Sequence, residues 1–325
     1  MTEAGTVSRV VGFIGLGAMG RPMVGALIEA GMDVVVHDLS ADALDAAGAA
    51  GARPAASAAE VATRTDVVFT MLPFAEDVEL ALIGPDGAAG GAHAGSVFVD
   101  ASTIDPMSLI VVARALSDQG IDSMDAAVSG SPQMVRERRA TVLVGGGPSL
   151  FSRCRPVLEA LGGTLVHTGA LGTAKVVKLA NNLVGAVSMA AVAEAFNLAM
   201  RAGVDPAVLH RAMSGSMGNC HALQVRPPAP GLVQDGPADH DFAPDFSVDF
   251  MAKDLRYALR TADARGAALP VASLARDLYV ATSARGDGGL DFSAVFRTVQ
   301  AMSGPEGAGD GRQDEGDDNK AGNSS

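Results

Sequence analysis

The chain has 325 residues, of which 48% are apolar and only 4% aromatic, and its formal net charge is −13. This length allows a sizeable core divided between two domains, and the apolar content predicts that most of the chain folds. The negative charge argues against nucleic acid as a partner, although a pocket for a small anion can still be locally positive.

The N-terminal residues, MTEAGTVSRVVGFIG, contain no basic start followed by an apolar run and a cleavage site. The two cysteines, Cys154 and Cys220, are too few for a disulfide framework, and no residues have metal-ligand spacing. We therefore expect a cytoplasmic protein without a metal site.

Short β-branched runs alternate with alanine-rich helical stretches between residues 10 and 167. The expected strands are 10–14, 33–37, 66–71, 96–100, 121–127, 141–145 and 163–167. Most intervening segments are long enough for crossover helices, so the rhythm predicts a doubly wound, Rossmann-type parallel sheet. The stretch 128–140 is the exception, because it is polar, basic and has no clear helical period.

A glycine motif, GFIGLGAMG, follows the first expected strand directly and opens a helical stretch at 18–30. Gly15, Gly17 and Gly20 have the spacing G-x-G-x-x-G, which permits a tight turn, close approach of a pyrophosphate and close helix packing. N–H groups at the helix start, including those of Ala18 and Met19, would hold the phosphates. The motif predicts a dinucleotide site.

An acidic residue, Asp38, ends the second expected strand eighteen residues after Gly20. A carboxylate there accepts hydrogen bonds from both ribose hydroxyls of the cofactor and repels a 2′-phosphate. The sequence therefore favours NAD over NADP.

Strand patterns stop after Thr168, and a long helix is expected at about 173–201. Asp205-Pro206 has the pattern of a helix cap and first turn, and further helices are expected at 247–266, 270–284 and 291–302. These patterns predict an NAD-binding domain at 8–168, an all-α domain for substrate and dimerisation at 169–302, and a disordered acidic tail at 303–325. Polar residues interrupt the long helix, which favours a core helix over a membrane span.

A polar strip marks the start of the long helix. Residues 178 and 182 are one turn apart, 175 falls close to the same line, and Gly185 continues it without a side chain. Lys175, Lys178 and Asn182 beside that bare patch would suit a small polar ligand. The alternative is a solvated helix face with amides placed by chance.

The motifs together resemble the β-hydroxyacid dehydrogenases, the family of 3-hydroxyisobutyrate dehydrogenase and tartronate semialdehyde reductase. The matching segments, in family order between residues 12 and 260, are GFIGLGAMGRPM, TMLPFAEDV, VDASTIDP, DAAVSG, LVGG, KLANN, EAFNLAMRAGVD and FSVDFMAKDL. The resemblance implies an NAD-dependent enzyme that acts on a short hydroxyacid or its semialdehyde.

By position, the resemblance implies that Leu72 and Pro73 form a turn against the cofactor. It implies that Ser102 helps to bind substrate and that Thr103 lies at the nicotinamide.

The same comparison implies that Ser129 and the N–H of Gly130 hold the substrate carboxylate. Lys178 matches the catalytic lysine and Asn182 the asparagine that orients the substrate. Lys253 belongs to a late Lys-Asp pair, with Asp254, and its side chain reaches toward the cofactor end of the cleft.

Oxidation of an alcohol requires a base that takes the hydroxyl proton as the hydride leaves. Lys178 can serve if its pKa is lowered, and we expect the helix dipole, the positive nicotinamide and Lys253 to lower it. In the reducing direction the ammonium donates the proton. Lys175 is a competitor for this role, or otherwise a helper or a surface residue of the first turn.

The chain departs from the family pattern in its loop SGSPQMVRERRA. Ser131, Met134 and Arg138 stand where the family has glycine, and Ala174 replaces a glycine before the long helix. These bulkier residues near the pocket argue against 3-hydroxyisobutyrate itself as the substrate. The arginines at 136, 138 and 139 either bind a second anionic group of the substrate or form a solvated loop.

Two other functions remain open. An imine reductase shares this architecture, but those enzymes generally lack the lysine found here at 178. A non-catalytic NAD-binding sensor would be expected to lack the lysine pair and Asn182. Family members pair their helical domains, so we expect a homodimer or homotetramer.

Overall fold

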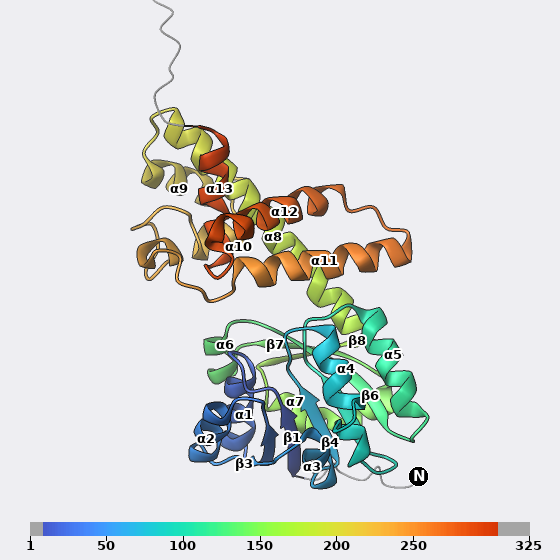
Figure 1. Ribbon diagram of the computed structural model, residues 1–325. Coiled ribbons are helices and arrows are strands. Elements are labelled where there is room, and N and C mark those ends of the chain that lie inside the picture. The colour runs from blue at the N-terminus through green and yellow to red at the C-terminus, as the bar shows by residue number, and fades with distance from the viewer. Residues whose placement is uncertain (1–8, 305–325) are drawn as a thin grey trace, which may run out of the picture.

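The computed structural model describes residues 9–304 and shows two domains joined by one long helix. The lower domain in Figure 1 is a sheet with helices on both faces, and the upper domain is entirely helical. This confirms the predicted fold class. The expected acidic tail lies, apart from Ser303 and Gly304, outside the described residues.

The sheet has eight strands in the order β3-β2-β1-β4-β5-β6-β7-β8. The strands are β1 (Val10–Ile14), β2 (Asp33–His37), β3 (Arg53–Pro54), β4 (Val67–Thr70), β5 (Val97–Asp100), β6 (Asp122–Ser129), β7 (Thr141–Gly145) and β8 (Thr164–Gly169). Seven of them match expected strands. The sequence missed β3, because two exposed residues leave no alternating pattern.

The expected parallel sheet has one antiparallel pair near one edge. β6 and β7 pair antiparallel, with Ser129 opposite Thr141, whereas the other neighbouring pairs are parallel. The connection between them is short and contains only a five-residue helix, which cannot cross back over the sheet. β7 and β8 therefore run opposite to the first six strands.

Helices cover both faces of this sheet. The helices of the first domain are α1 (Gly20–Glu29), α2 (Ala41–Ala49), α3 (Ala58–Thr63), α4 (Ala75–Ile83), η1 (Ala88–Gly90), α5 (Pro106–Ser117), α6 (Pro132–Arg136) and α7 (Pro148–Glu159). One buried cluster joins the sheet to α1 and α7, and another joins it to α3, α4 and α5. Alternation along β1 divides its side chains, since Phe13 enters the first cluster and Ile14 the second.

The helical domain starts with α8, whose bounds match the expected ones. Its helices are α8 (Thr173–Arg201), α9 (Pro206–Ser214), α10 (His221–Val225), η2 (Pro237–His240), α11 (Val248–Arg265), α12 (Pro270–Thr282), η3 (Ser283–Asp287), η4 (Phe292–Ala294) and α13 (Val295–Met302). Asp205 caps α9 as expected, because its carboxylate accepts from the N–H groups of Ala207 and Val208.

By length and apolar composition alone, α8 is the one helix among residues 9–304 that could cross a membrane. In the structure, its second half contributes Ala186, Met189 and Phe196 to the core shared by α8, α11, α12 and α13. Its first turns pack on the sheet, with Leu179 in the cluster under α4 and α5. α8 is thus a core helix that belongs to both domains.

Candidate active site

The glycine loop between β1 and α1 has the geometry of a phosphate cradle. Gly15 has φ +98°, and a Cβ there would lie 2.4 Å from the carbonyl oxygen of Met71. A Cβ at Gly20 would lie 1.9 Å from the oxygen of Gly15, so neither glycine can be replaced without a shift of backbone. At Gly17 a Cβ would meet no atom within 4 Å. That open side, next to the exposed Ala18 and the half-buried Met19, fits the approach of a pyrophosphate.

Asp38 lies beside this loop at the end of β2. Its Oδ2 accepts a hydrogen bond from the N–H of Leu16 at 2.6 Å, and its Oδ1 accepts from the N–H of Ser40 at 2.8 Å. The carboxylate is therefore fixed beside the glycine loop, and its contact with a ribose stays a prediction. The neighbouring His37 contacts the carbonyl of Ala55 across the strand end, which makes it a structural residue.

Two loops after β4 and β5 form the next part of the site. The N–H of Leu72 donates to Oγ of Ser102 at 2.9 Å, which ties the two loops together. Pro73 is exposed and Thr103 is half-buried, but Ser102 is fully buried. The Ser102 hydroxyl thus holds the loops in this conformation, and its contact with substrate stays a prediction.

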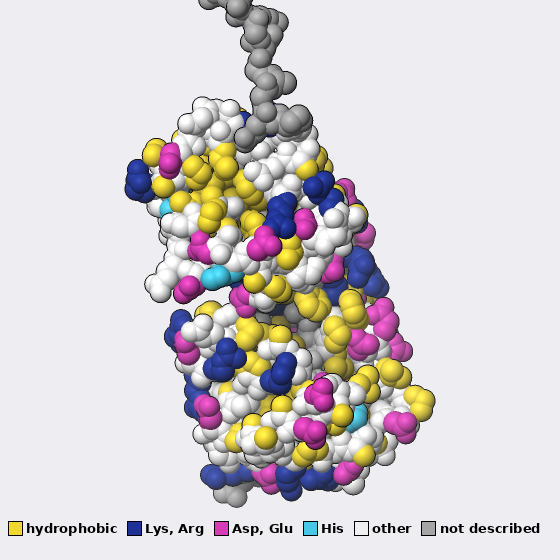
Figure 2. All heavy atoms as spheres, turned by 60° about the vertical axis from the view of Figure 1, so that its left-hand side comes forward, with side chains coloured by type: hydrophobic (Ala, Val, Ile, Leu, Met, Phe, Trp, Pro, Cys, Tyr) yellow, Lys and Arg dark blue, Asp and Glu magenta, His cyan; other side chains and the backbone are white. Residues whose placement is uncertain are grey.

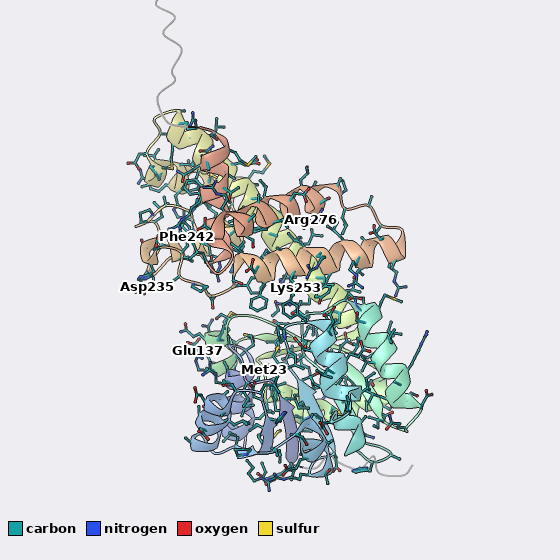
Figure 3. The ribbon with its side chains drawn as sticks, in the orientation of Figure 1. Met23, Glu137, Asp235, Phe242, Lys253 and Arg276 are labelled. Atoms are coloured by element: carbon teal, nitrogen blue, oxygen red, sulfur yellow. The ribbon has the colours of Figure 1, made fainter. Side chains whose placement is uncertain are left out.

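Lys253 extends from α11 toward these loops, and Figure 3 shows it on the side of α11 that faces the sheet domain. Its Nζ donates to the carbonyls of Pro73 at 2.9 Å and Thr103 at 3.1 Å. The rings of Phe74, Phe250 and Tyr257 surround the ammonium, with centroids 5.2 to 5.9 Å away. Burial lowers the pKa of Lys253, and Asp254 opposes that shift.

Asp254 connects Lys253 to the polar strip on α8. It is 2% exposed, its Oδ1 lies 3.4 Å from Nζ of Lys253, and its Oδ2 accepts from Nδ2 of Asn182 at 2.7 Å. Burial raises the pKa of Asp254, while Lys253 and the hydrogen bond from Asn182 lower it. The sequence named Asp254 only as a partner of Lys253, because nothing in the chain shows that α8 and α11 cross at this point.

Lys178 lies half-buried on the same face of α8. Its pKa is lowered, first by burial; the charge of Asp254 raises it, and Lys253 lowers it further. The predicted direction is confirmed, but burial is the main cause. The surface is hollowed along the line where the two domains meet (Figure 2), and the polar groups described above lie at that junction.

The structure contradicts two of the places that the sequence suggested for Lys175. It is not on the surface and does not join the polar strip, because its side chain is completely buried and turned toward the sheet. A step of three residues rotates a helix position by about 60° from the line of Lys178. On the first turn of α8, that rotation directs the long side chain to the carboxyl ends of the strands.

The loop after β6 differs from expectation. β6 extends to Ser129, and Gly130 has φ +150°. The stretch with no helical period contains α6, which the hydroxyl of Ser131 caps. Arg138 takes a left-handed conformation at φ +52°, which glycine adopts without strain.

The three arginines of this loop are exposed and have different neighbours. Arg139 pairs with Glu137, with Nε 2.7 Å from Oε2. Arg136 lines a shallow groove on α1 together with Ala18 and Arg21. Within residues 9–304, no group of three or more His, Cys, Asp or Glu side chains is placed to hold a metal ion.

Known proteins match this chain along nearly its whole length. The model for the NAD binding domain of 6-phosphogluconate dehydrogenase matches residues 10–169. The model for the NAD-binding domain of NADP-dependent 3-hydroxyisobutyrate dehydrogenase matches residues 172–299.

Among curated relatives, a probable 3-hydroxyisobutyrate dehydrogenase of Mycobacterium tuberculosis is 39% identical over 293 residues, covering 90% of this chain and 98% of that protein. A 2-(hydroxymethyl)glutarate dehydrogenase of Eubacterium barkeri is 34% identical, covering 90% and 96%.

A solved structure of M. tuberculosis 3-hydroxyisobutyrate dehydrogenase with L-serine superposes with a TM-score of 0.83 at 38% identity, covering 91% of this chain and all of that one. Imine reductases, at 19–22% identity, share only the fold. The resemblance drawn from the motifs is confirmed: the chain belongs to the 3-hydroxyisobutyrate dehydrogenase family of NAD(P)-dependent hydroxyacid dehydrogenases.

Proposed function

We propose that this protein oxidises a short β-hydroxyacid with NAD, using Lys178 as the group that takes the hydroxyl proton. One observation carries the proposal: a half-buried lysine with a lowered pKa lies beside Asn182 and Asp254, and Lys253 ties that cluster to the loops beyond β4 and β5. The glycine loop, which follows β1 at the carboxyl ends of the parallel strands, supplies the dinucleotide site.

The chemistry divides among residues of this chain. NAD, when bound, supplies the acceptor for the hydride. Burial keeps a larger fraction of Lys178 as the free amine, which can accept the proton of the substrate hydroxyl; in reduction the ammonium returns it. Asp254 holds the amide of Asn182 at 2.7 Å, so that Asn182 meets the substrate in one orientation.

The substrate carboxylate is assigned to the start of the loop after β6. Ser129 ends the strand, and Gly130 has a backbone conformation that directs its N–H independently of any side chain. One relative is named for 3-hydroxyisobutyrate, which has one carboxylate, and another for 2-(hydroxymethyl)glutarate, which has two. The substrate of this protein is therefore expected to carry one or two carboxylates. The exposed Arg136 and Arg138 favour testing the second class as well.

The test is NADH formation from a panel that contains 3-hydroxyisobutyrate, 2-(hydroxymethyl)glutarate and a phosphorylated hydroxyacid. Turnover of one or more acids supports the proposal, and NAD binding without turnover on any acid contradicts it. An Arg138→Ala variant then separates the substrate classes. A loss confined to the dianionic acid assigns Arg138 to substrate, and equal rates on both acids assign it to the solvated loop.

The cofactor preference is proposed as NAD over NADP. Both oxygens of Asp38 are fixed by backbone N–H groups, so the carboxylate cannot easily turn away from an added 2′-phosphate. The ratio of kcat/KM for NAD and NADP measures this preference directly.

We also propose that two copies associate through α8. Val177, Val184 and Leu198 are 41%, 62% and 72% exposed, and they lie on one stripe of the helix at multiples of seven residues. A second copy of the same helix would cover such a stripe. Light scattering of the purified protein should give the mass of a dimer or tetramer, and Val184→Lys should reduce it to the mass of one chain. Cell fractionation should recover the protein in the cytoplasmic fraction.

A further inference from the structure

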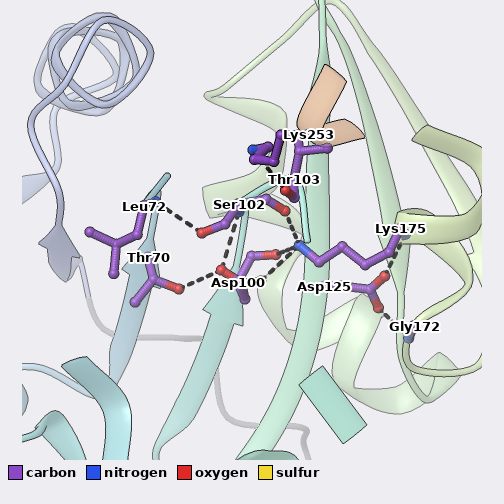
Figure 4. A network of polar contacts seen from close by, with 9 residues as sticks. All are labelled: Thr70, Leu72, Asp100, Ser102, Thr103, Asp125, Gly172, Lys175 and Lys253. Carbon is purple, nitrogen blue, oxygen red and sulfur yellow. Dashed lines mark hydrogen bonds and ion pairs between the residues drawn. The ribbon is translucent and has the colours of Figure 1, made fainter. Parts of the chain in front are cut away.

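Lys175 is a buried charge that the proposed mechanism does not use. Its side chain has no exposed surface, and it lies where α8 begins against the sheet. The ammonium donates to the carbonyl oxygens of Asp100 at 2.7 Å and Ser102 at 2.5 Å, and it lies 2.9 Å from Oδ2 of Asp100 (Figure 4). Two of the three N–H groups of the ammonium thus donate to main-chain carbonyls at the end of β5 and just after it, while its charge pairs with the carboxylate of Asp100.

Asp100 is held as firmly as the lysine. Its Oδ1 accepts from Oγ1 of Thr70 at 2.8 Å and from the N–H of Ser102 at 3.1 Å, while its Oδ2 meets Lys175. The lysine and the aspartate therefore fix the loop that follows β5 through both its main chain and its side chain.

A second aspartate, Asp125, fixes the backbone at the start of α8. Oδ1 of Asp125 accepts from the N–H of Gly172 at 2.7 Å, and Oδ2 accepts from the N–H of Lys175 at 3.0 Å. Gly145 makes room for this carboxylate, since a Cβ there would lie 2.3 Å from Oδ1. The first turn of α8 is thus attached to β5 through the side chain of Lys175 and to β6 through the main-chain N–H groups of Gly172 and Lys175.

Stability is a weak reason for such an arrangement, because well-packed apolar residues commonly replace a buried ion pair without loss. The distribution of lysine along the chain instead indicates a role in the site between the two domains. The chain has only four lysines among 24 basic residues, and three of them, Lys175, Lys178 and Lys253, lie at the domain junction.

We propose that Lys175 is a positioning residue that fixes the loop 100–103 relative to Lys178, a role that rests on the proposed function. Lys178 lies three residues further along the same helix, so the proton-accepting amine and the loop bearing Thr103 move as one unit. Lys253 holds the same loop from the other side through the carbonyl of Thr103. Lys175 therefore sets the distance between the nicotinamide side of the cleft and the base.

The first turn of α8 is attached to the sheet domain, although the second half of the helix belongs to the helical core.

The test uses the full chain with two substitutions. Lys175→Met alone leaves Asp100 charged and buried, which endangers folding. Lys175→Met combined with Asp100→Asn removes both charges and keeps an oxygen to accept from Thr70 and Ser102. Thr282→Val is the matched control, because it removes a buried 2.8 Å contact with Thr298 that lies between α12 and α13.

The readouts are steady-state rates with 3-hydroxyisobutyrate, the primary deuterium isotope effect with that acid deuterated at the carbinol carbon, and hydrogen exchange of the peptide 97–106. For the double variant we expect kcat to fall about 10- to 100-fold, since small misplacements of reacting groups cost that much. The isotope effect on kcat should rise, exchange at 97–106 should quicken, and the pH midpoint of the rate should stay in place. Thr282→Val should lower only the melting temperature.

A double variant whose kcat is within twofold of wild type, or whose peptide 97–106 exchanges at the wild-type rate, overturns the proposal. So does a fall in melting temperature with unchanged kcat, which is the result for a purely structural ion pair. If the wild-type protein oxidises none of the hydroxyacids, the proposed function fails, and hydrogen exchange still reports whether Lys175 holds the loop.

Discussion

The two ends of the cleft are built in different ways. At the dinucleotide end, a single segment from Gly15 to Gly20 makes the site out of backbone, and Asp38 is the main side chain that supports it. At the proposed catalytic end, three lysines, three aspartates and an asparagine come from β5, β6, α8 and α11.

This difference determines how each end responds to change. A backbone site tolerates most side-chain substitutions but fails where a Cβ cannot fit. In the side-chain cluster, removing one charge changes the electrostatics of the others, because the pKa values of Lys178, Lys253 and Asp254 depend on one another. Five predictions test the contrast.

The largest effect is expected at Lys178. Lys178→Met should lower kcat about 10²- to 10⁴-fold, which is the usual contribution of a positioned acid–base group. Lys178→Arg should fail as well, because a guanidinium stays protonated at working pH. Calorimetric NAD binding should remain within a few-fold of wild type, and turnover of either variant above a tenth of wild type would remove Lys178 from the mechanism.

The glycine loop should separate folding from binding. Gly20→Ala places a Cβ 1.9 Å from the oxygen of Gly15 and should destabilise the protein by about 1–3 kcal/mol, as overpacking does. Gly17→Ala meets no atom within 4 Å, so it should keep the melting temperature and weaken NAD binding. Equal melting temperatures for the two variants would show that the loop is free to relax.

The same contrast explains what the sequence could predict. The glycine loop, Asp38, the bounds of α8 and the cap of α9 are local patterns, and the structure has them as expected. The burial of Lys175 was not predictable, because its partners lie 73 to 75 residues away in the chain. The antiparallel edge was missed for a related reason: pairing direction depends on a connection whose helix is too short to show a period.

Asp38 gives the next largest effect. Asp38→Asn removes the negative charge but retains an oxygen for the N–H of Leu16, so the loop should stay folded. We expect the preference for NAD over NADP, measured as a ratio of kcat/KM, to fall about tenfold or more, since repulsion of the 2′-phosphate is lost. Asp42→Asn removes an equal charge from the first turn of α2 and should leave the ratio unchanged; a similar fall in both variants would point to long-range charge alone.

Asp254 and Lys253 should move the pH profile in opposite directions. Oxidation needs the amine form of Lys178, so the rate rises with pH through its pKa. Asp254 raises that pKa, and Asp254→Asn should shift the rising limb to lower pH. Lys253 lowers it, and Lys253→Met should shift the limb to higher pH. Rates at saturating NAD across pH measure both, and shifts of the same sign would assign the limb to another group.

The smallest effect is expected in the arginine loop, where two exposed arginines differ in backbone conformation. Arg138 has φ +52°, a conformation that glycine adopts without cost, whereas Arg136 is the last residue of α6. Arg138→Gly should therefore raise the free energy of unfolding by about 0.5–1 kcal/mol, and Arg136→Gly should lower it by a similar amount. Denaturant midpoints resolve differences of this size. Because both variants lose the same charge, destabilisation by Arg138→Gly would show that the Arg138 side chain makes contacts that outweigh the backbone strain it imposes.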